Sequence, residues 1–321
     1  MTLSSDAPRT ETRFLYTGQS LTRSPIQLPN SDCTIAPRVS LSNFTSFRVG
    51  GPAEWYVAPR NIEDMQASLA WAEGRSLPVT LLGAGSNMLA SDRGIPGLTI
   101  ATRHLRHSQF SEDGLVTANA GEPIARLAWR AAKRGWQGLE WAVGIPGTVG
   151  GSIVMNAGAH RACIADSLIE AVVLNSNGSL EYLTPEDLQF SYRTSILQTD
   201  KRLVVQATFK LQPGGDREEV MARTNRNLQH RKSTQPYHLP SCGSVFRNPE
   251  SHAAGWLIEQ TGLKGFQIGG AQVAHRHANF ILNCDRAKAK DILQLIQHVQ
   301  ETVEQRWSLS LHPEVKLVGE F

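Results

Sequence analysis

Long hydrophobic runs are what this chain most clearly lacks. No apolar stretch in its 321 residues approaches the roughly 18–20 residues of a membrane helix. The N-terminus, MTLSSDAPRTETRFLYTGQS, is polar and contains no signal-peptide core. We therefore expect a cytoplasmic protein that has no membrane partner.

Cysteine is scarce, and its spacing excludes two classes of protein. The four cysteines, at 33, 163, 242 and 284, form no CxxC pair, which argues against a disulfide framework and against a zinc site. The pair His275 and His277 forms an H-x-H motif, but no further ligands stand at a suitable spacing. We expect reduced cysteines and no metal.

An excess of charge of one sign is also missing. The net charge is +3, and no run of lysine and arginine appears, so we expect no nucleic-acid partner. The 40% hydrophobic and 19% charged residues are typical of a soluble globular enzyme. The length predicts two or three domains.

Helix and strand patterns mix along the chain without a regular βα repeat, which predicts an α+β fold. Residues 1–37 are rich in Ser, Thr, Pro and Asn and are expected to form a disordered arm, followed by short strands over 44–49 and 55–57. Asn177-Gly178 predicts a hairpin over 168–183. Helices are expected within 61–74, 122–135, 216–233, 252–262 and 287–307, and further strands within 78–82, 114–121, 203–210, 277–283 and 312–319.

Two glycine-rich, charge-poor stretches raise the question of what the backbone must approach. LGAGSNML follows a predicted strand, but a dinucleotide fingerprint fails there, because Met88 replaces the third glycine and Arg103 the acidic residue. GIPGTVGGSIVMNAGAH follows some 60 residues later. Together they suggest one long ligand, such as a dinucleotide, held from two sides, with Arg48 as an added cation. These two stretches do not distinguish flavin from nicotinamide.

Three further motifs complete a recognisable set: SYRTS with Arg193, SCGSVFRNP with Ser244 and HPEVKLVG with Glu314. With FRVGGPA, LGAGSNML, GIPGTVGGSIVMNAGAH and RKSTQP, the set resembles the UDP-N-acetylenolpyruvoylglucosamine reductase family over about residues 40–319. The spacing resembles the shorter, type II branch, which lacks an inserted tyrosine-bearing loop. The family reduces UDP-N-acetylglucosamine enolpyruvate to UDP-N-acetylmuramate in peptidoglycan biosynthesis, with FAD as cofactor and NADPH as electron donor.

The resemblance implies an FAD-binding unit of the PCMH/vanillyl-alcohol-oxidase type, in two subdomains, and an α+β substrate-binding domain. We place these at 38–103, 104–214 and 215–321, with a C-terminal strand that returns to the active site. We expect a monomer.

The resemblance also implies the site residues. Arg193 would hold the substrate carboxylate, Ser244 would donate the proton and Glu314 would support it as an acid. The implied FAD contacts are Arg48, Gly83, Ala84, Gly85, Ser86, Asn87, Gly144, Ile145, Pro146, Gly147, Gly150, Gly151, Asn156 and Gly158. The implied substrate contacts are Lys232, Gln235, Asn248 and Gln272.

Three positions depart from the family pattern: Ala274, Arg276 and Lys316, the last where arginine is common. Two alternatives stay open. One is an FAD-dependent oxidase of the same fold, and the other is a nucleotide-binding sensor that does not need Arg193, Ser244 and Glu314 together. The preference for NADPH over NADH is not readable from any motif.

Overall fold

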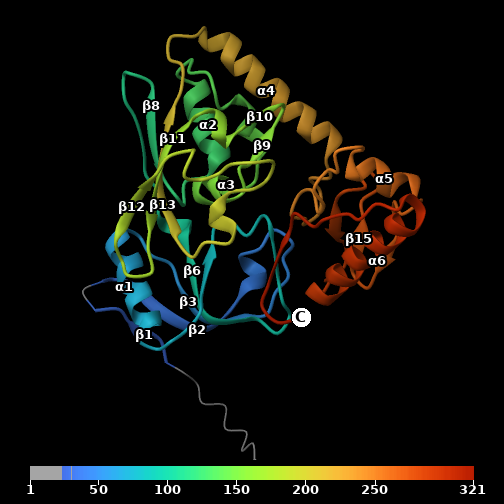
Figure 1. Ribbon diagram of the computed structural model, residues 1–321, viewed down its shortest axis with the longest axis horizontal. Helices are drawn as coiled ribbons and strands as arrows, with labels where there is room; N and C mark the ends of the chain where they lie inside the picture. The colour runs from blue at the N-terminus through green and yellow to red at the C-terminus, as the bar shows by residue number, and fades with distance from the viewer. Residues whose placement is uncertain (1–23, 30) are drawn as a thin grey trace, which may run out of the picture.

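The first sheet is mixed and has the strand order β1-β2-β3-β6-β4 (Figure 1). The structure is a computed structural model that describes residues 24–29 and 31–321. Strands β1 to β3 pair antiparallel, whereas β3, β6 and β4 run parallel. The strands are β1 (Ile26–Gln27), β2 (Thr34–Ser40), β3 (Pro52–Val57), β4 (Val79–Leu82) and β6 (Ile95–Ala101). Helix α1 (Ile62–Glu73) begins where the Asn61 side chain accepts a hydrogen bond from the Asp64 N–H, as predicted.

The prediction of a disordered arm is wrong for residues 24–29 and 31–37. Two strands form there, and Leu28 and Ile35 are buried in the core of the first sheet. Residues 1–23 and 30 lie outside the described part. The strand expected over 44–49 is also wrong. That segment is a turn, and its apolar residues Phe47 and Val49 pack into the C-terminal core instead.

The second sheet is antiparallel, with the order β12-β11-β13-β8-β7. Its strands are β7 (Ser108–Phe110), β8 (Leu115–Asn119), β11 (Leu168–Leu174), β12 (Leu180–Leu183) and β13 (Leu203–Lys210). The predicted hairpin at Asn177-Gly178 joins β11 to β12. Helices α2 (Ile124–Ala132) and α3 (Val149–Val154) contribute to its core, and a small hairpin of β9 (Gly158–Ala159) and β10 (Ala162–Cys163) follows α3. Val172 and Leu203 of this sheet share a core with Leu98 of the first sheet, so the two sheets pack together.

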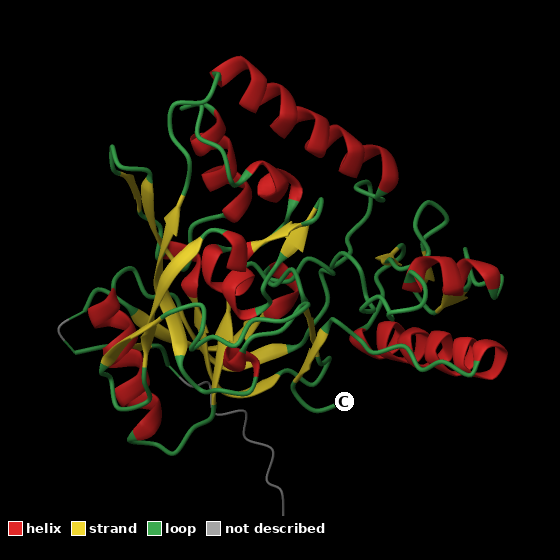
Figure 2. Ribbon diagram, turned by 45° about the horizontal axis from the view of Figure 1, so that its top comes forward, coloured by secondary structure: helices red, strands yellow, loops and turns green. Residues whose placement is uncertain are grey.

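The C-terminal unit carries a small antiparallel sheet of β14 (Gln267–Ile268), β15 (Ala271–Val273) and β16 (Ile281–Asn283). Helices α5 (Ala254–Gln260) and α6 (Ala289–Trp307) lie side by side there, apart from the central sheets (Figure 2). The predicted apolar stripe of α6 is buried as expected. The helical stripe therefore supplies much of this unit's core.

Helix α4 (Arg217–Thr234) runs from the second sheet toward the C-terminal unit (Figure 1). The sequence-based boundary at 215 assigns α4 to the C-terminal unit, but α4 packs on α2 and on the 3-10 helix η3 (Glu140–Gly144). Arg223 pairs with the buried Glu140 carboxylate at 3.5 Å, and Asn227 donates to the Glu140 carbonyl at 3.0 Å. Four more 3-10 turns are η1 (Leu41–Asn43), η2 (Thr102–His104), η4 (Ile164–Asp166) and η5 (Ile196–Gln198).

The C-terminal unit is tied to the first sheet's unit. Strand β17 (Lys316–Val318) pairs parallel with β5 (Met88–Ala90). The Asp92 carboxylate accepts from the N–H groups of Ala289 and Lys290, at 2.8 and 2.9 Å, and so caps α6 across the interface. The last strand therefore returns from the C-terminal unit to the edge of the site.

Candidate active site

A cavity of ≈ 780 Å³ lies where the three units meet. Its volume is in the range of cofactor and substrate pockets. The lining comes from the loop 83–87, the segment 145–158, the turn at 192–193, the end of α4, the loop 242–248 and the C-terminal segment 314–316. Residues far apart in the sequence thus line one continuous space.

The two glycine stretches meet at this cavity, as expected for a clamp. The Ser86 hydroxyl donates to the Pro146 carbonyl at 2.7 Å and joins the two loops directly. The N–H groups of residues 83–87 donate to no acceptor within the part of the chain that the structure describes. Because unpaired backbone N–H groups in folded proteins are rare, this loop can receive acceptors such as phosphate oxygens.

The individual glycines of the two stretches serve two different purposes. A Cβ on Gly85 would overlap the Phe44 carbonyl, and a Cβ on Gly150 would lie 2.9 Å from the Ala120 Cβ. A Cβ on Gly158 would lie 2.5 Å from the Ala162 carbonyl oxygen. By contrast, a Cβ on Gly147 or Gly151 would come no nearer than 3.4 or 3.5 Å to any described atom. Of these five glycines, Gly147 and Gly151 are the two at which an absent side chain leaves room for a ligand in the cavity.

Three of the expected FAD contacts do not line the cavity. Arg48 is exposed in the turn that precedes Gly50. Gly144 lies against α4, where its carbonyl accepts from the Arg231 Nε at 3.0 Å. Asn156 is buried, and its amide donates to the Ser191 carbonyl and accepts from the Ala165 N–H. Asn156 therefore fastens the turn that bears Arg193 rather than facing the cavity.

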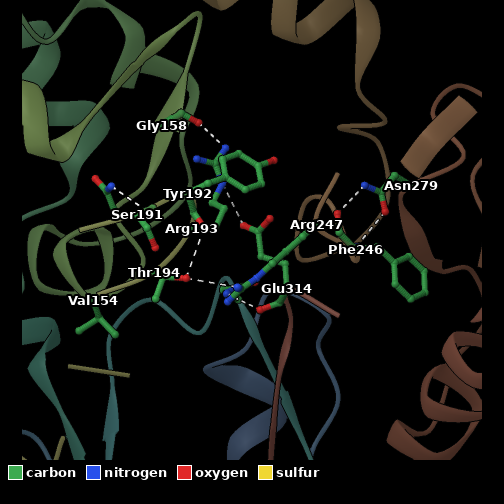
Figure 3. Close-up of polar contacts among 12 residues, drawn as sticks. Val154, Gly158, Ser191, Tyr192, Arg193, Thr194, Phe246, Arg247, Asn279 and Glu314 are labelled. Atoms are coloured by element: carbon green, nitrogen blue, oxygen red, sulfur yellow. Dashed lines mark hydrogen bonds and ion pairs between the residues drawn. The ribbon is translucent and has the colours of Figure 1, made fainter. Parts of the chain in front are cut away.

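Arg193 is held in place from both sides (Figure 3). Its Nη2 donates to the Gly158 carbonyl at 2.7 Å, and its Nε lies 3.4 Å from a carboxylate oxygen of Glu314. Its backbone has a φ of 56°, in the left-handed region that non-glycine residues seldom adopt. Such a conformation persists only where the surroundings impose it, and it is common at functional sites.

Glu314 is the partner of Arg193 and is mostly buried. Burial raises the pKa of its carboxyl group, while Arg193 and Arg247 act in the opposite direction. The segment is fixed by its own N–H, which donates to the Val245 carbonyl at 2.7 Å, and by its carbonyl, which accepts from Asn87 at 3.1 Å. A carboxyl group with a raised pKa can act as an acid.

Ser244 lines the same cavity, on a loop that Asn279 holds. The buried Asn279 amide donates to the Phe246 carbonyl at 2.8 Å and accepts from the Phe246 N–H at 2.9 Å. Burial raises the pKa of the Cys242 thiol well above its usual range, so this thiol is a poor nucleophile. Asn279 could not be predicted from the sequence, because a single amide within HANFILN carries no motif.

The expected substrate contacts divide evenly. Gln235 and Asn248 line the cavity, whereas Lys232 and Gln272 do not. Arg231, next to Lys232, does line it. Of the two neighbouring cations in HRKS, Arg231 is therefore the one at the cavity.

The three departures have separate explanations. Lys316 lines the cavity, and its Nζ donates to the Gln198 Oε1 at 2.8 Å. Arg276 is exposed and donates to the Lys232 carbonyl at 3.4 Å, and Ala274 is buried in an apolar cluster. A second cation, Arg247, was missed, although it stands three residues after Ser244. Its contacts with Thr194 and Gln198 join segments about 50 residues apart, which no local motif shows.

Metal ligation finds no support in the geometry. No group of three or more His, Cys, Asp or Glu side chains within residues 24–29 and 31–321 is placed to hold a metal ion. The His277 ring lies 4.8 Å from the Phe280 ring, and its Nδ1 accepts from the Asn279 N–H.

None of the helices described is both long and apolar enough to cross a membrane.

Comparison with known proteins identifies the family. Residues 53–184 match the FAD binding domain family, and residues 235–318 match the C-terminal domain of UDP-N-acetylenolpyruvoylglucosamine reductase. The UDP-N-acetylenolpyruvoylglucosamine reductase of Nostoc punctiforme is 62% identical over 311 residues, which cover 97% of this chain and 94% of that protein. The chain belongs to the UDP-N-acetylenolpyruvoylglucosamine reductase family. The Synechocystis protein of that name is 60% identical over 299 residues, which cover 92% of this chain and 94% of that protein.

The fold agrees with this membership. The crystal structure of the Thermus caldophilus reductase matches with a TM-score of 0.77 and 34% identity, over 89% of this chain and 99% of that one. The chain is thus an FAD-dependent oxidoreductase of peptidoglycan synthesis, with NADPH as reductant, and its α+β fold and FAD-binding unit are confirmed. The loop 83–87, with its unpaired N–H groups, and the open faces of Gly147 and Gly151 fit such a cofactor.

Proposed function

We propose that one cavity serves both half-reactions of UDP-N-acetylglucosamine enolpyruvate reduction. NADPH enters and leaves before the enolpyruvyl substrate binds in the same place. The observation that carries this proposal is that Arg193, Ser244 and Glu314 line the same cavity as the two glycine stretches. FAD, when bound, supplies the hydride chemistry, and the chain supplies position, charge and a proton.

Arg193 has the role of binding the substrate carboxylate. Hydride addition to the alkene pushes negative charge toward that carboxylate, and a guanidinium can stabilise it through two parallel hydrogen bonds. Its Nη2 stays on the Gly158 carbonyl, while its Nε, now 3.4 Å from Glu314, turns to the substrate.

Glu314 changes its protonation state as a consequence. Arg193 is one of two cations that hold its pKa down against the effect of burial. A substrate carboxylate that takes up Arg193 and adds a negative charge raises this pKa further, so that Glu314 becomes a neutral acid. Ser244 then donates its proton to the carbon next to the one that receives hydride, and a protonated Glu314 supports that transfer.

The joint presence of Arg193, Ser244 and Glu314 favours turnover over a nucleotide sensor, because a sensor needs no proton donor. The oxidase alternative is tested by acid denaturation of the purified protein. We expect FAD to be released, as for a non-covalent cofactor, and retention of flavin on the protein would favour a tethered oxidase.

The remaining expectations are part of the same proposal. The protein acts in the cytoplasm as a monomer, without membrane or nucleic-acid partners. Gel filtration with light scattering tests the monomeric state.

Stopped-flow measurement of the two half-reactions tests the roles. Ser244→Ala should keep FAD reduction by NADPH and lose about 10²–10⁴-fold in flavin reoxidation by the enolpyruvyl substrate. Ser233→Ala, at an exposed serine near the end of α4, is the matched control and should behave as wild type. Reoxidation of Ser244→Ala at the wild-type rate would show that the proton comes from another group.

A further inference from the structure

Gln198 lies behind the cavity wall, at the end of η5, and does not line the cavity itself. We propose that Gln198 is a positioning residue for the carboxylate-binding side of the site: its single amide sets both the Arg193 turn and the two cations Arg247 and Lys316. This inference rests on the proposed roles of Arg193 and Glu314.

The nitrogen of the Gln198 amide holds the Arg193 turn. Nε2 donates to the Arg193 carbonyl at 2.8 Å and to the Val154 carbonyl, at the end of α3, at 3.2 Å. The Arg193 backbone is in the left-handed region and needs such support. Because Val154 lines the cavity, this nitrogen also fixes the turn relative to the glycine-rich segment.

The oxygen of the same amide faces the opposite side of the site. Oε1 accepts from the Lys316 Nζ at 2.8 Å and from the Arg247 Nη2 at 3.4 Å. Arg247 in turn donates through Nη1 to the Thr194 hydroxyl at 3.2 Å, next to Arg193 (Figure 3). Gln198 is therefore an acceptor shared by two cations.

One of those two cations acts directly on Glu314. Arg247 lowers the pKa of the Glu314 carboxyl through its charge, while Lys316 follows Glu314 by two residues in the C-terminal segment. The buried Nε of Arg247 has no hydrogen-bond partner in the described chain, so its guanidinium depends on Thr194 and Gln198 for its orientation. Displacement of the Gln198 oxygen would leave both cations less constrained.

The arrangement requires a donor and an acceptor in one planar group of this length. Glutamate would keep the acceptor for the cations but lose both bonds to carbonyls, and methionine would keep the shape but lose all four contacts. The two substitutions therefore separate the effect on the Arg193 turn from the effect on the cations.

The experiment measures both half-reactions and their pH dependence in the FAD-loaded variants Gln198→Met and Gln198→Glu. For Gln198→Met we expect near-normal FAD content and reduction by NADPH, and about 10²-fold slower reoxidation at saturating enolpyruvyl substrate, the scale of a small misplacement of catalytic groups. For Gln198→Glu we also expect slower reoxidation. The pH at which the reoxidation rate falls should move to a higher value, because a new negative charge beside Arg247 and Lys316 raises the pKa of Glu314.

Gln206→Met is the matched control. Gln206 is also half-buried and donates through its amide, to Asn119 at 3.1 Å, but neither it nor Asn119 lines the cavity, and it contacts neither Arg193 nor the cations near Glu314. It should reoxidise as wild type does. Reoxidation of both Gln198 variants within twofold of wild type, or an equal loss in the NADPH half-reaction, would overturn the inference. Absence of substrate-dependent reoxidation in the wild type itself would instead overturn the proposed function, and the inference with it.

Discussion

Gly151→Ala should strengthen the fold and weaken FAD binding. Gly151 lies in the first turn of α3, and an added Cβ would meet only the Thr148 hydroxyl, at 3.5 Å. Alanine in a helix is favoured over glycine by roughly 0.5–1 kcal/mol, so the apoprotein should gain about that stability. If FAD packs against the open face of Gly151, the extra methyl costs about 1–3 kcal/mol of binding, or about 5–150-fold in Kd.

The neighbouring glycine provides the control. A Cβ on Gly150 would lie 2.9 Å from the Ala120 Cβ and 3.3 Å from the Ala120 carbonyl oxygen. The same substitution one residue away should therefore destabilise the apoprotein, by about 1–3 kcal/mol, because the overlap is internal to the protein.

Urea unfolding of the deflavinated variants gives the stabilities, and FAD fluorescence titration gives the affinities. The two variants should move in opposite directions in stability. Wild-type FAD affinity in Gly151→Ala would refute the placement of the cofactor against this face of α3. Destabilisation of that variant would refute the reading of its surroundings as open.

Three other perturbations have clear expected outcomes. Arg193→Lys should leave flavin reduction by NADPH intact and slow reoxidation about tenfold to a hundredfold, the equivalent of the roughly 1.5–3 kcal/mol from one hydrogen bond to a charged group; equal slowing of both half-reactions would contradict this. Glu314→Gln should match wild type in thermal stability at acid pH and should be more stable than wild type as the pH rises. The raised pKa of the buried Glu314 makes its ionisation costly in the folded state, so the wild type loses stability at higher pH. Melting curves across pH check the sign of this difference. Asp92→Ala should lower the free energy of unfolding by about 0.5–2 kcal/mol through loss of the cap on α6, with Glu301→Ala on the exposed face of that helix as the neutral comparison in urea unfolding.

The elements that could be predicted from the sequence are those whose signal is local. The stripe of α6, the cap at Asn61 and the turn at Asn177-Gly178 each depend on residues a few positions apart, and all three form as expected. Residues 34–40 were missed, because TIAPRVS has little strand character alone and becomes a strand by pairing with β3. Phe47 and Val49 were wrongly predicted to form a strand. They are apolar because they pack into a core whose other residues come mostly from the C-terminal unit.

The same distinction applies to the site. Arg193, Ser244 and Glu314 stand in motifs that resemblance makes visible, and the structure places all three at one cavity. Asn279 and Gln198 act through hydrogen bonds from their side-chain amides to backbone groups, Phe246 and Val154 among them, that lie 33 and 44 residues away, and an isolated amide has no spacing rule. Asn156 shows the converse: a residue inside a motif can be needed to hold a turn rather than to line the cavity.

The pairing of β17 with β5 determines when the site can first exist during synthesis. The two strands lie far apart in the chain, and the contact between Asn87 and the Glu314 carbonyl closes a separation of 227 residues. Domains generally fold from the N-terminus as the chain emerges, and contacts between remote segments form slowly. The nascent protein therefore has both glycine stretches outside the ribosome well before it has Glu314, and the Glu314 carboxyl reaches the cavity later than the two loops that it faces.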